Sequence, residues 1–310
     1  MMGKRVWGAP LVLLSATCFG FLPTFTAYAY QHRITVFTLL FLRFSIAALL
    51  FFGYLAVRGQ LRLPRGRDLA LLAVLGGVLY ELQSITFFSS VRYIPPPLAV
   101  LLLYLFPAIV MLLSVVMDRE RLSGRRLTAM LVAFAGIALI FGLPGGSVNL
   151  LGVVLAVGSA IFYSLYIVFG NRVSPSVSPM AIGGYVCVFG AISSGLVGGA
   201  TGELRFDFAP AGWWPVLGLA VVSTVVAIGS FFAGMSLIGP SSAAVLSMFE
   251  PVVSIIAAWL LLGSQLTGPQ LFGGAVVLVG AVLAVTAVRP GPDGTPAEAA
   301  AGELESKPVA

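Results

Sequence analysis

Apolar residues run along this chain in long stretches, which are separated by short segments rich in charged residues, proline and glycine. A stretch of about 20 apolar residues is the length that an α-helix needs to cross the hydrocarbon core of a bilayer. The pattern predicts ten such helices, joined by connections too short to hold a soluble domain. Their expected ranges are 6–30, 34–57, 68–90, 94–117, 124–142, 150–170, 179–200, 212–235, 240–262 and 268–288.

The composition also indicates a multi-pass membrane protein. Hydrophobic residues make up 59% of the 310 residues, charged residues only 9%, and the mean hydropathy is +1.05. A soluble fold of this size does not bury so much apolar surface. We therefore expect an all-α membrane protein with ten transmembrane helices embedded in the lipid bilayer.

The formal net charge of +6 is distributed unevenly between the two sides of the predicted membrane. With the N-terminus inside, only Arg33, Arg92 and Arg205 fall outside. This positive-inside pattern predicts that both termini are cytoplasmic and that the chain spans the cytoplasmic (inner) membrane. No basic surface remains for a nucleic-acid partner. The basic residues of the inner side are Lys4, Arg5, Arg58, Arg62, Arg65, Arg67, Arg119, Arg121, Arg125, Arg126, Arg172, Arg289 and Lys307.

The chain repeats itself with an offset of 144 residues. Pro107 then coincides with Pro251, and "ERLSGRRL" at 120–127 coincides with "SQLTGPQL" at 264–271. Compositional coincidence explains any single match, but one offset across five helices favours duplication. We expect a first five-helix repeat over 1–146, a second over 147–288, and a disordered cytoplasmic tail over 289–310, which is rich in Pro, Gly, Ala and Glu.

Because each repeat holds an odd number of helices, the second repeat must enter the membrane in the opposite orientation. The loop charges agree, since four arginines precede the fifth helix and none precedes the tenth. Inverted repeats of this kind are a recurrent plan of secondary transporters, which bind substrate near the midplane between the halves.

Several segments resemble a known transporter family. They are "LLFLRFSIAALL", which contains Arg43, "YLFPAIV", "DRERLSGRRL" and "FEPVVSIIAAWLLLGSQLTGPQLFGGAVVLVGAVLAV". In this order they are similar to the EamA-type members of the drug/metabolite transporter superfamily, up to about residue 288. The resemblance implies two inverted five-helix bundles around a central cavity, and transport of small metabolites, often amino acids, without ATP. One departure is Ser264, where the family usually has a glutamate; Glu120 keeps that glutamate in the first half.

Three charged residues fall inside the predicted helices, where charges are costly and mark functional candidates. Arg43 and Glu81 each lie nine residues from the outer end of their helix, so both should lie roughly 14 Å deep. On neighbouring helices they are expected to pair. The pair has two interpretations. It is either a structural ion pair, or a functional site in which Glu81 takes up a proton or meets substrate while Arg43 tunes it.

The third charge, Glu250, lies near the midplane of the ninth helix, directly before Pro251. An unpaired buried carboxylate tends to take up a proton, so Glu250 is a candidate proton carrier or cation site. The alternative is a protonated carboxyl that bonds a backbone carbonyl freed by a proline. Pro107 and Pro251 each free such a carbonyl, and we expect both to bend their helices at the midplane, facing the cavity.

Polar and aromatic residues on inward helix faces are candidates for the wall of a substrate cavity. The third helix supplies four that share one face, and three other helices add phenols and a hydroxyl. Ordinary packing between helices is the competing explanation for each of them. The candidates are Tyr80, Gln83, Ser84, Phe87, Tyr104, Tyr163, Tyr166 and Ser247.

The sequence offers no constellation for catalysis. His32 is the single histidine, Cys18 and Cys187 lie in apolar segments, and no Walker motif is present. We expect no enzyme, no cofactor and no metal. The favoured function is a secondary active transporter of small organic metabolites such as amino acids, working by alternating access around the midplane cavity. Export is the favoured direction, and proton coupling is one option. The alternative is a membrane enzyme or lipid-handling protein that uses the same cavity.

Overall fold

The computed structural model describes residues 7–118 and 149–287, except 171, 175, 239–242, 244, 245, 248 and 265. Between them it also describes 124, 127, 128, 131, 132, 134–136 and 139. Most of the predicted fifth helix at 124–142, the tail, and the basic residues at 4, 5, 119, 121, 125, 126, 289 and 307 lie outside the described residues, as does Glu120.

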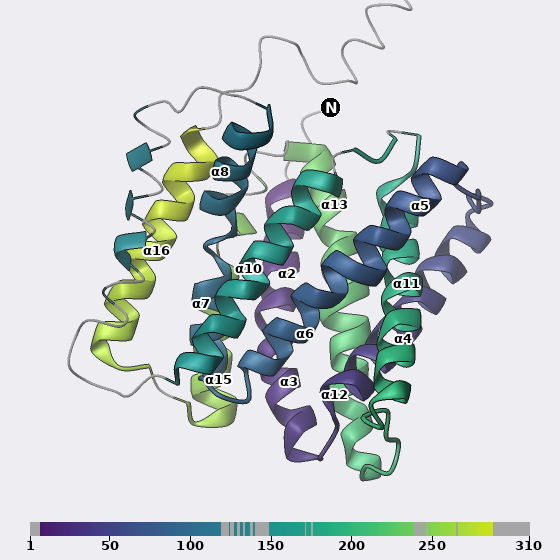
Figure 1. The fold of residues 1–310 in the computed structure, drawn as a ribbon, viewed down its shortest axis with the longest axis horizontal. Helices are drawn as coiled ribbons and strands as arrows, with labels where there is room; N and C mark the ends of the chain where they lie inside the picture. The colour runs from purple at the N-terminus through teal and green to yellow at the C-terminus, as the bar shows by residue number, and fades with distance from the viewer. Residues whose placement is uncertain are drawn as a thin grey trace, which may run out of the picture.

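Throughout the described ranges the secondary structure is helical, with no strand (Figure 1). Two stretches, η1 and η3, are π-helical. The elements are α2 Gly8–Gly20, α3 Leu22–Gln31, α4 Val36–Val57, α5 Gly66–Val74, η1 Leu75–Tyr80, α6 Glu81–Ser90, α7 Pro96–Leu103, α8 Phe106–Asp118, α10 Leu150–Gly170, α11 Pro179–Ala200, η2 Pro210–Gly212, α12 Trp213–Leu217, η3 Gly218–Val226, α13 Ala227–Ile238, α15 Glu250–Leu262 and α16 Gly268–Ala287.

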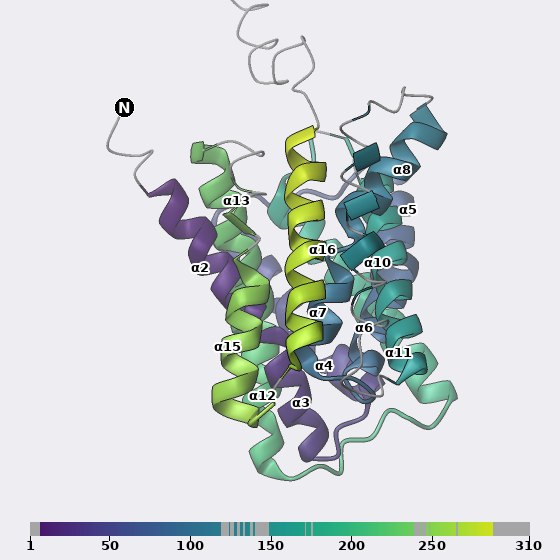
Figure 2. The same ribbon diagram turned by 90° about the vertical axis from the view of Figure 1, so that its left-hand side faces the viewer.

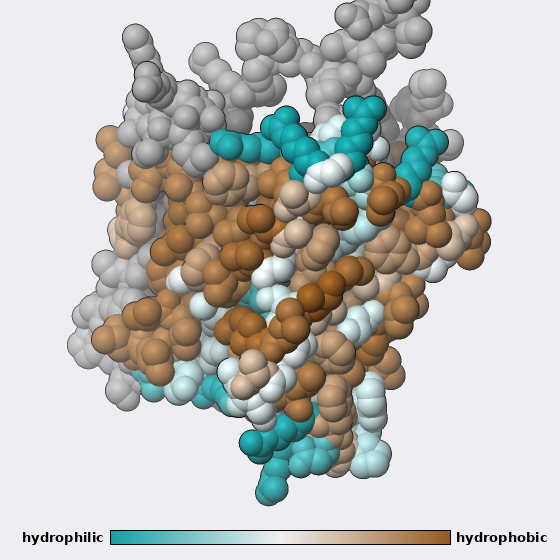
Figure 3. Space-filling view, turned by 45° about the vertical axis from the view of Figure 1, so that its right-hand side comes forward, coloured by the Kyte–Doolittle hydropathy of each residue, from teal (hydrophilic) through white to brown (hydrophobic). Residues whose placement is uncertain are grey.

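The surface of the bundle is typical of a membrane protein. Six continuous helical stretches are long and apolar enough to span a bilayer. Shorter apolar helices cover Pro96–Val110, Glu250–Leu262 and Leu271–Gly280. In Figure 3 the hydrophilic side chains gather at the two ends of the visible face, and hydrophobic side chains cover most of the area between. The six spans are Gly8–Gln31, Val36–Val57, Gly66–Ser90, Leu150–Gly170, Pro179–Ala200 and Pro210–Ile238.

The elements recur at the offset seen in the sequence. The bounds of α8 and α15 differ by 144 residues at both ends, and η1 shifted by 144 falls inside η3. Repeat-related helices also run in opposite directions, as α4 and α11 show in Figure 1. The start of α2 and the end of α16 lie at the same end of the bundle (Figure 2). The π-helical turns are thus a shared feature of both halves, which the apolar pattern did not predict.

The two halves are interleaved. Helix α13 packs on α2, α6 packs on α10, and the repeat-related helices α4 and α11 pack on each other. One close contact of a glycine occurs at equivalent positions of both halves. Gly8 lies against Ile238, and Gly152 lies against Ile94. A side chain at either glycine would collide with the facing residue, so the absence of a Cβ allows these helices to approach closely.

Helix starts follow ordinary capping chemistry. The Thr35 hydroxyl accepts the Thr38 N–H at 3.2 Å before α4, and the Ser178 hydroxyl accepts the Ala181 N–H at 3.3 Å before α11. These bonds satisfy backbone donors that a helix leaves without partners in its first turn.

Each of the two prolines lies next to an interruption of its helix, and the bend expected there from the sequence stays a prediction. Between α7 and α8 the chain forms a turn at Tyr104 and Leu105, so Pro107 is the second residue of a new helix. Pro251 is likewise the second residue of α15, after a turn at Phe249. A proline is tolerated in the first helical turn, because the N–H that it lacks would have no partner within the new helix.

Candidate functional site

Arg43 is fully enclosed in the bundle by helices from both halves. It lies in α4 with 2% of its surface exposed. Its Nε donates to the Thr224 hydroxyl at 2.9 Å, and its Nη2 lies 3.5 Å from the Tyr80 hydroxyl. Tyr80 ends η1 and Thr224 lies in η3, 144 positions apart, so the guanidinium contacts equivalent positions of the two halves.

The environment of Arg43 is otherwise aromatic. The guanidinium carbon lies 5.3 Å from the ring centroids of both Phe44 and Phe88, which is within cation–π range. Within the described ranges no ion pair is formed by Arg43. The buried cation is therefore held by two hydroxyls and two rings, all of them neutral.

Glu81 does not pair with Arg43, although the sequence led us to expect it. It is 2% exposed, its Oε1 accepts the Ser194 hydroxyl at 2.6 Å, and its Oε2 is buried without a hydrogen-bond partner among the described residues. Equal depth was inferred from a regular rise and leaves rotation about the helix axis undetermined. The wider π-helical turn of η1 directly before Glu81 changes that rotation.

Glu250 is the first residue of α15, at the interruption of the helix, and is half-buried. The Tyr104 hydroxyl lies 3.1 Å from the Glu250 Oε2 and donates to the Ser247 carbonyl at 3.0 Å. Ser247 lies four residues before Pro251, so its carbonyl is the one that the proline leaves without an N–H. A phenol from α7–α8 thus joins a carboxyl and a freed carbonyl on either side of the second interruption.

A chain of aromatic rings connects the surroundings of Glu250 with those of Arg43. Successive ring centroids are 5.9, 4.9, 6.0, 5.1 and 5.7 Å apart. Four of the rings are half-buried although they contact one another across several helices. In order, the chain is Tyr104, Phe106, Tyr163, Tyr166, Tyr80 and Phe44, of which Tyr104 and Phe44 are buried.

The remaining candidates of the third helix pack in the interior. Ser84 and Phe87 are 0% and 3% exposed, and Ser84 donates to the Gln83 Oε1 at 3.2 Å. Tyr80, the fourth residue of the expected face, instead contacts Phe44 and Tyr166 by its ring. The face is divided because Tyr80 ends the π-helical turn.

Sequence reasoning missed Thr224, Ser194 and Phe44 as members of these clusters. Small hydroxyl residues and phenylalanines are common in membrane helices and attract no attention alone. The repeat offset carried a signal for Thr224, since it is the counterpart of the candidate Tyr80.

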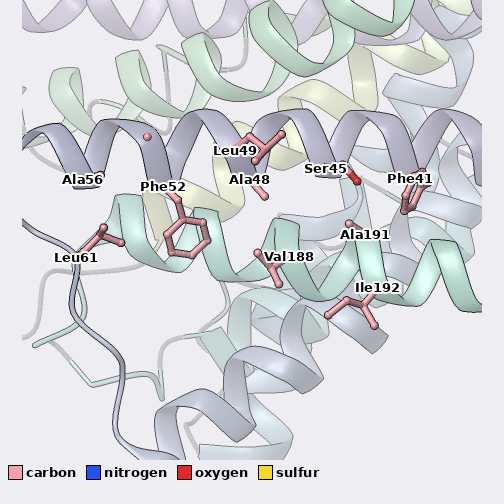
Figure 4. Close-up of a pocket in the computed structure, with 11 residues that line it drawn as sticks. Phe41, Ser45, Ala48, Leu49, Phe52, Ala56, Leu61, Val188, Ala191 and Ile192 are labelled. Atoms are coloured by element: carbon pink, nitrogen blue, oxygen red, sulfur yellow. The ribbon is translucent and has the colours of Figure 1, made fainter.

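An apolar groove lies apart from these clusters, where α4 and α11 pack together (Figure 4). Its volume is about 700 Å³, and Ser45 supplies the single side-chain hydroxyl among its lining residues. Such a lining suits hydrocarbon rather than a polar solute. A smaller hollow of about 260 Å³ lies near the α4 start and includes Arg92 and Glu203. No group of three metal-binding side chains occurs among the residues that the structure describes.

Comparison with protein families decides the class of protein. The model of the EamA-like transporter family matches residues 6–142 and again 150–286, once in each half. The chain belongs to the EamA-like transporter family. As a member of this family it is a multi-pass membrane protein and a transporter rather than an enzyme.

Relatives of this EamA-like protein are named as transporters or exporters. An uncharacterized transporter of Archaeoglobus fulgidus is 29% identical over 90% of this chain and 96% of its own. The threonine/homoserine exporter RhtA of Escherichia coli K12 is 25% identical over 74% of this chain and 75% of its own. One crystal structure, 21% identical, matches with a TM-score of 0.61 over 93% of this chain and 99% of that one, which supports the fold.

Proposed function

We propose that this protein is a secondary active exporter of small zwitterionic metabolites such as amino acids. It would span the cytoplasmic membrane with ten helices in two inverted repeats, both termini cytoplasmic, and work by alternating access. Arg43, Glu250 and the half-buried rings between them would contact the substrate. The carrying observation is that Arg43 and Glu250, one in each half, form hydrogen bonds only to neutral groups among the described residues.

The charge arrangement favours a substrate with both signs. A buried ion that no counter-ion contacts directly is costly, and intramembrane charges in transporters commonly contact substrate or coupling ions. A carboxylate would pair with Arg43, whose forked guanidinium suits it, and an ammonium would pair with Glu250. The printed name of the RhtA relatives, a threonine/homoserine exporter, agrees with this class and with export.

Proton coupling is part of the proposal and rests on the two carboxyl groups. Glu81 has one buried oxygen without a partner among the described residues, and Glu250 contacts a neutral phenol. Either group can alternate between a proton and a cationic ligand during a transport cycle. The apolar groove on α4 and α11 supports the alternative, a lipid-handling protein, because its lining suits an acyl chain.

The test compares a zwitterion with two analogues on purified protein in nanodiscs. Threonine should raise the melting temperature. Its N-acetyl form, which lacks the ammonium, and its amide, which lacks the carboxylate, should raise it less. Arg43→Gln should lose the preference for threonine over the amide, and Glu250→Gln the preference for threonine over the N-acetyl form. Arg58→Gln, at an exposed arginine on the bundle end, is the matched control and should keep both preferences.

Proteoliposomes complete the test. Labelled threonine should leave the preloaded vesicles without chemical change. Its efflux should be faster when protons are available for exchange. A modified product without flux would contradict the proposal and favour the enzyme alternative. Equal stabilisation by threonine and both analogues would overturn the assignment of a zwitterionic substrate.

A further inference from the structure

We propose that Tyr104 is a switch controlled by protonation of Glu250. Its hydroxyl either holds the turn before α15 together by bonding the Ser247 carbonyl or lets this turn open. The inference rests on the proposed function only in that the switch would couple transport to protons. The switch itself needs only three groups of this chain. These are the Glu250 carboxyl, the Tyr104 hydroxyl and the Ser247 carbonyl, joined by the two contacts of 3.1 and 3.0 Å.

The Tyr104 hydroxyl supplies fewer hydrogens than the ionised site has acceptors. A tyrosine hydroxyl has one hydrogen to donate, and both an ionised carboxylate and a backbone carbonyl only accept. When Glu250 is ionised, the two acceptors compete for this one hydrogen. A charged acceptor forms the stronger bond, so Tyr104 donates to Glu250 and the Ser247 carbonyl loses its donor.

A proton from water changes this arrangement. The neutral carboxyl acquires an O–H, which donates to the Tyr104 oxygen. Tyr104 keeps its own hydrogen and turns it toward the Ser247 carbonyl, so all three groups are then satisfied. No covalent bond of Tyr104 breaks, and the only transfer is the proton gained by Glu250.

The change of acceptor by the Tyr104 hydroxyl affects the backbone, because the Ser247 carbonyl has lost its helical donor. Pro251 has no N–H, so the Ser247 carbonyl lacks the donor that a continuous helix would supply four residues on. Tyr104 is the donor from another element that replaces it. In the apolar interior a carbonyl without a donor is costly, so its loss favours opening of the turn at Phe249. Protonation therefore closes the interruption and ionisation loosens it.

Among the described residues, the helices that pack against α15 bring no charged side chain to Glu250. Helix α15 packs against α2, α3 and α7, none of which carries a Lys, Arg, Asp or Glu. The helix N-terminus favours an anion at Glu250 and burial without a cation opposes it, so both states are accessible. The titratable groups near α15 are the thiol of Cys18 on α2, the phenols of Tyr28 and Tyr30 on α3, His32 after α3, Tyr104 itself, and Tyr163 on α10 beside Phe106.

The experiment measures hydrogen exchange at the interruption, with protein in nanodiscs at two pH values and exposure times scaled for the intrinsic exchange rate. The reporters are the amides of Phe249 and Val253, which donate to the Leu246 and Phe249 carbonyls. In the unmodified protein both should exchange roughly two- to tenfold faster at the higher pH, as expected for loss of about one hydrogen bond.

Two single substitutions should have opposite effects. In Glu250→Gln the amide N–H₂ replaces the carboxyl O–H, so exchange should be slow at both pH values. In Tyr104→Phe neither acceptor has a donor, so exchange should be fast at both. The matched control is Tyr28→Phe. It removes a phenol that donates to an α15 carbonyl, that of Leu261 at 2.7 Å, and it should keep the pH dependence.

Retention of the pH dependence in Tyr104→Phe would overturn the switch, and this holds even if Glu250→Gln fails to fold. The readout needs no substrate, so failures can be told apart. A pH-dependent interruption in a protein without flux would contradict the proposed function and leave the switch standing. Flux with a pH-independent interruption would overturn the switch alone.

Discussion

The two interrupted helices use the same backbone device and carry different chemistry. In each, a proline is the second residue of the new helix, and α8 and α15 begin 144 positions apart. The first residue is Phe106 in one and Glu250 in the other. The Phe106 ring packs edge-on against Tyr163, whereas the Glu250 carboxyl contacts Tyr104.

This difference separates architecture from function. The interruptions recur because each half has a proline at the equivalent position. The backbone follows the same path in both halves although the residue before the proline differs. The carboxyl occurs in the second half alone, and its counterpart is a ring without a titratable group. We infer that the repeated features build the scaffold and that the differences between the halves perform transport.

The largest expected effect on flux comes from giving the second interruption the side chain of the first. Glu250→Phe places the residue of the first half at the start of α15 and removes the carboxyl. We expect threonine flux in proteoliposomes to fall at least tenfold, equivalent to about 1.4 kcal/mol. Phe249→Leu, at the exposed neighbouring position, is the control and should keep its flux. Normal flux in Glu250→Phe would place the functional asymmetry elsewhere.

A smaller effect is expected when each proline is replaced. Pro251→Ala restores an N–H that competes with Tyr104 for the Ser247 carbonyl, so flux should fall by roughly threefold, or about 0.7 kcal/mol. Pro107→Ala restores an N–H at an interruption without a carboxyl, and should reduce flux less. Proteoliposome flux and melting temperature are measured for both variants. Equal losses would mean that the interruptions act as hinges of the same kind.

The smallest effect concerns the first interruption alone. The Ser164 hydroxyl lies 3.2 Å from the Phe106 carbonyl and donates to the Ala160 carbonyl at 2.6 Å. Ser164→Ala should lower the free energy of unfolding by about 0.5–1.5 kcal/mol, the range for one hydrogen bond, and leave flux and its pH dependence unchanged. Chemical denaturation in detergent measures the first quantity. A changed pH dependence would show that the first interruption also takes part in coupling.

The sequence predicted much of the scaffold. Apolar length located the six stretches that are long enough to span a bilayer. The offset of 144 anticipated that α8 and α15 would correspond and that α4 and α11 would run in opposite directions. The interruptions were expected as bends at the correct prolines. What the apolar pattern lacked was the π-helical geometry of η1 and η3, because a wide turn depends on how backbones pack and leaves hydrophobicity unchanged.

The candidate site was predicted less well, for a physical reason. Helical rise gives the depth of Arg43 and Glu81 from the sequence, but contact also needs the rotation of each helix, which packing decides. Hence Arg43 bonds Thr224, and Glu81 bonds Ser194. The sequence indicated that Pro251 frees a carbonyl, and the hydroxyl of Tyr104, already a candidate, contacts that carbonyl.

The position of Arg43 has a consequence for the ancestry of such chains. Helices α4 and α11 are equivalents that pack on each other, and the counterpart of Arg43 is Cys187. In a homodimer of one five-helix unit, every residue near the two-fold axis would face its own copy. Two arginines there would repel each other strongly in so apolar a medium. A fused gene escapes that restraint, because each copy of the ancestral position is free to mutate alone.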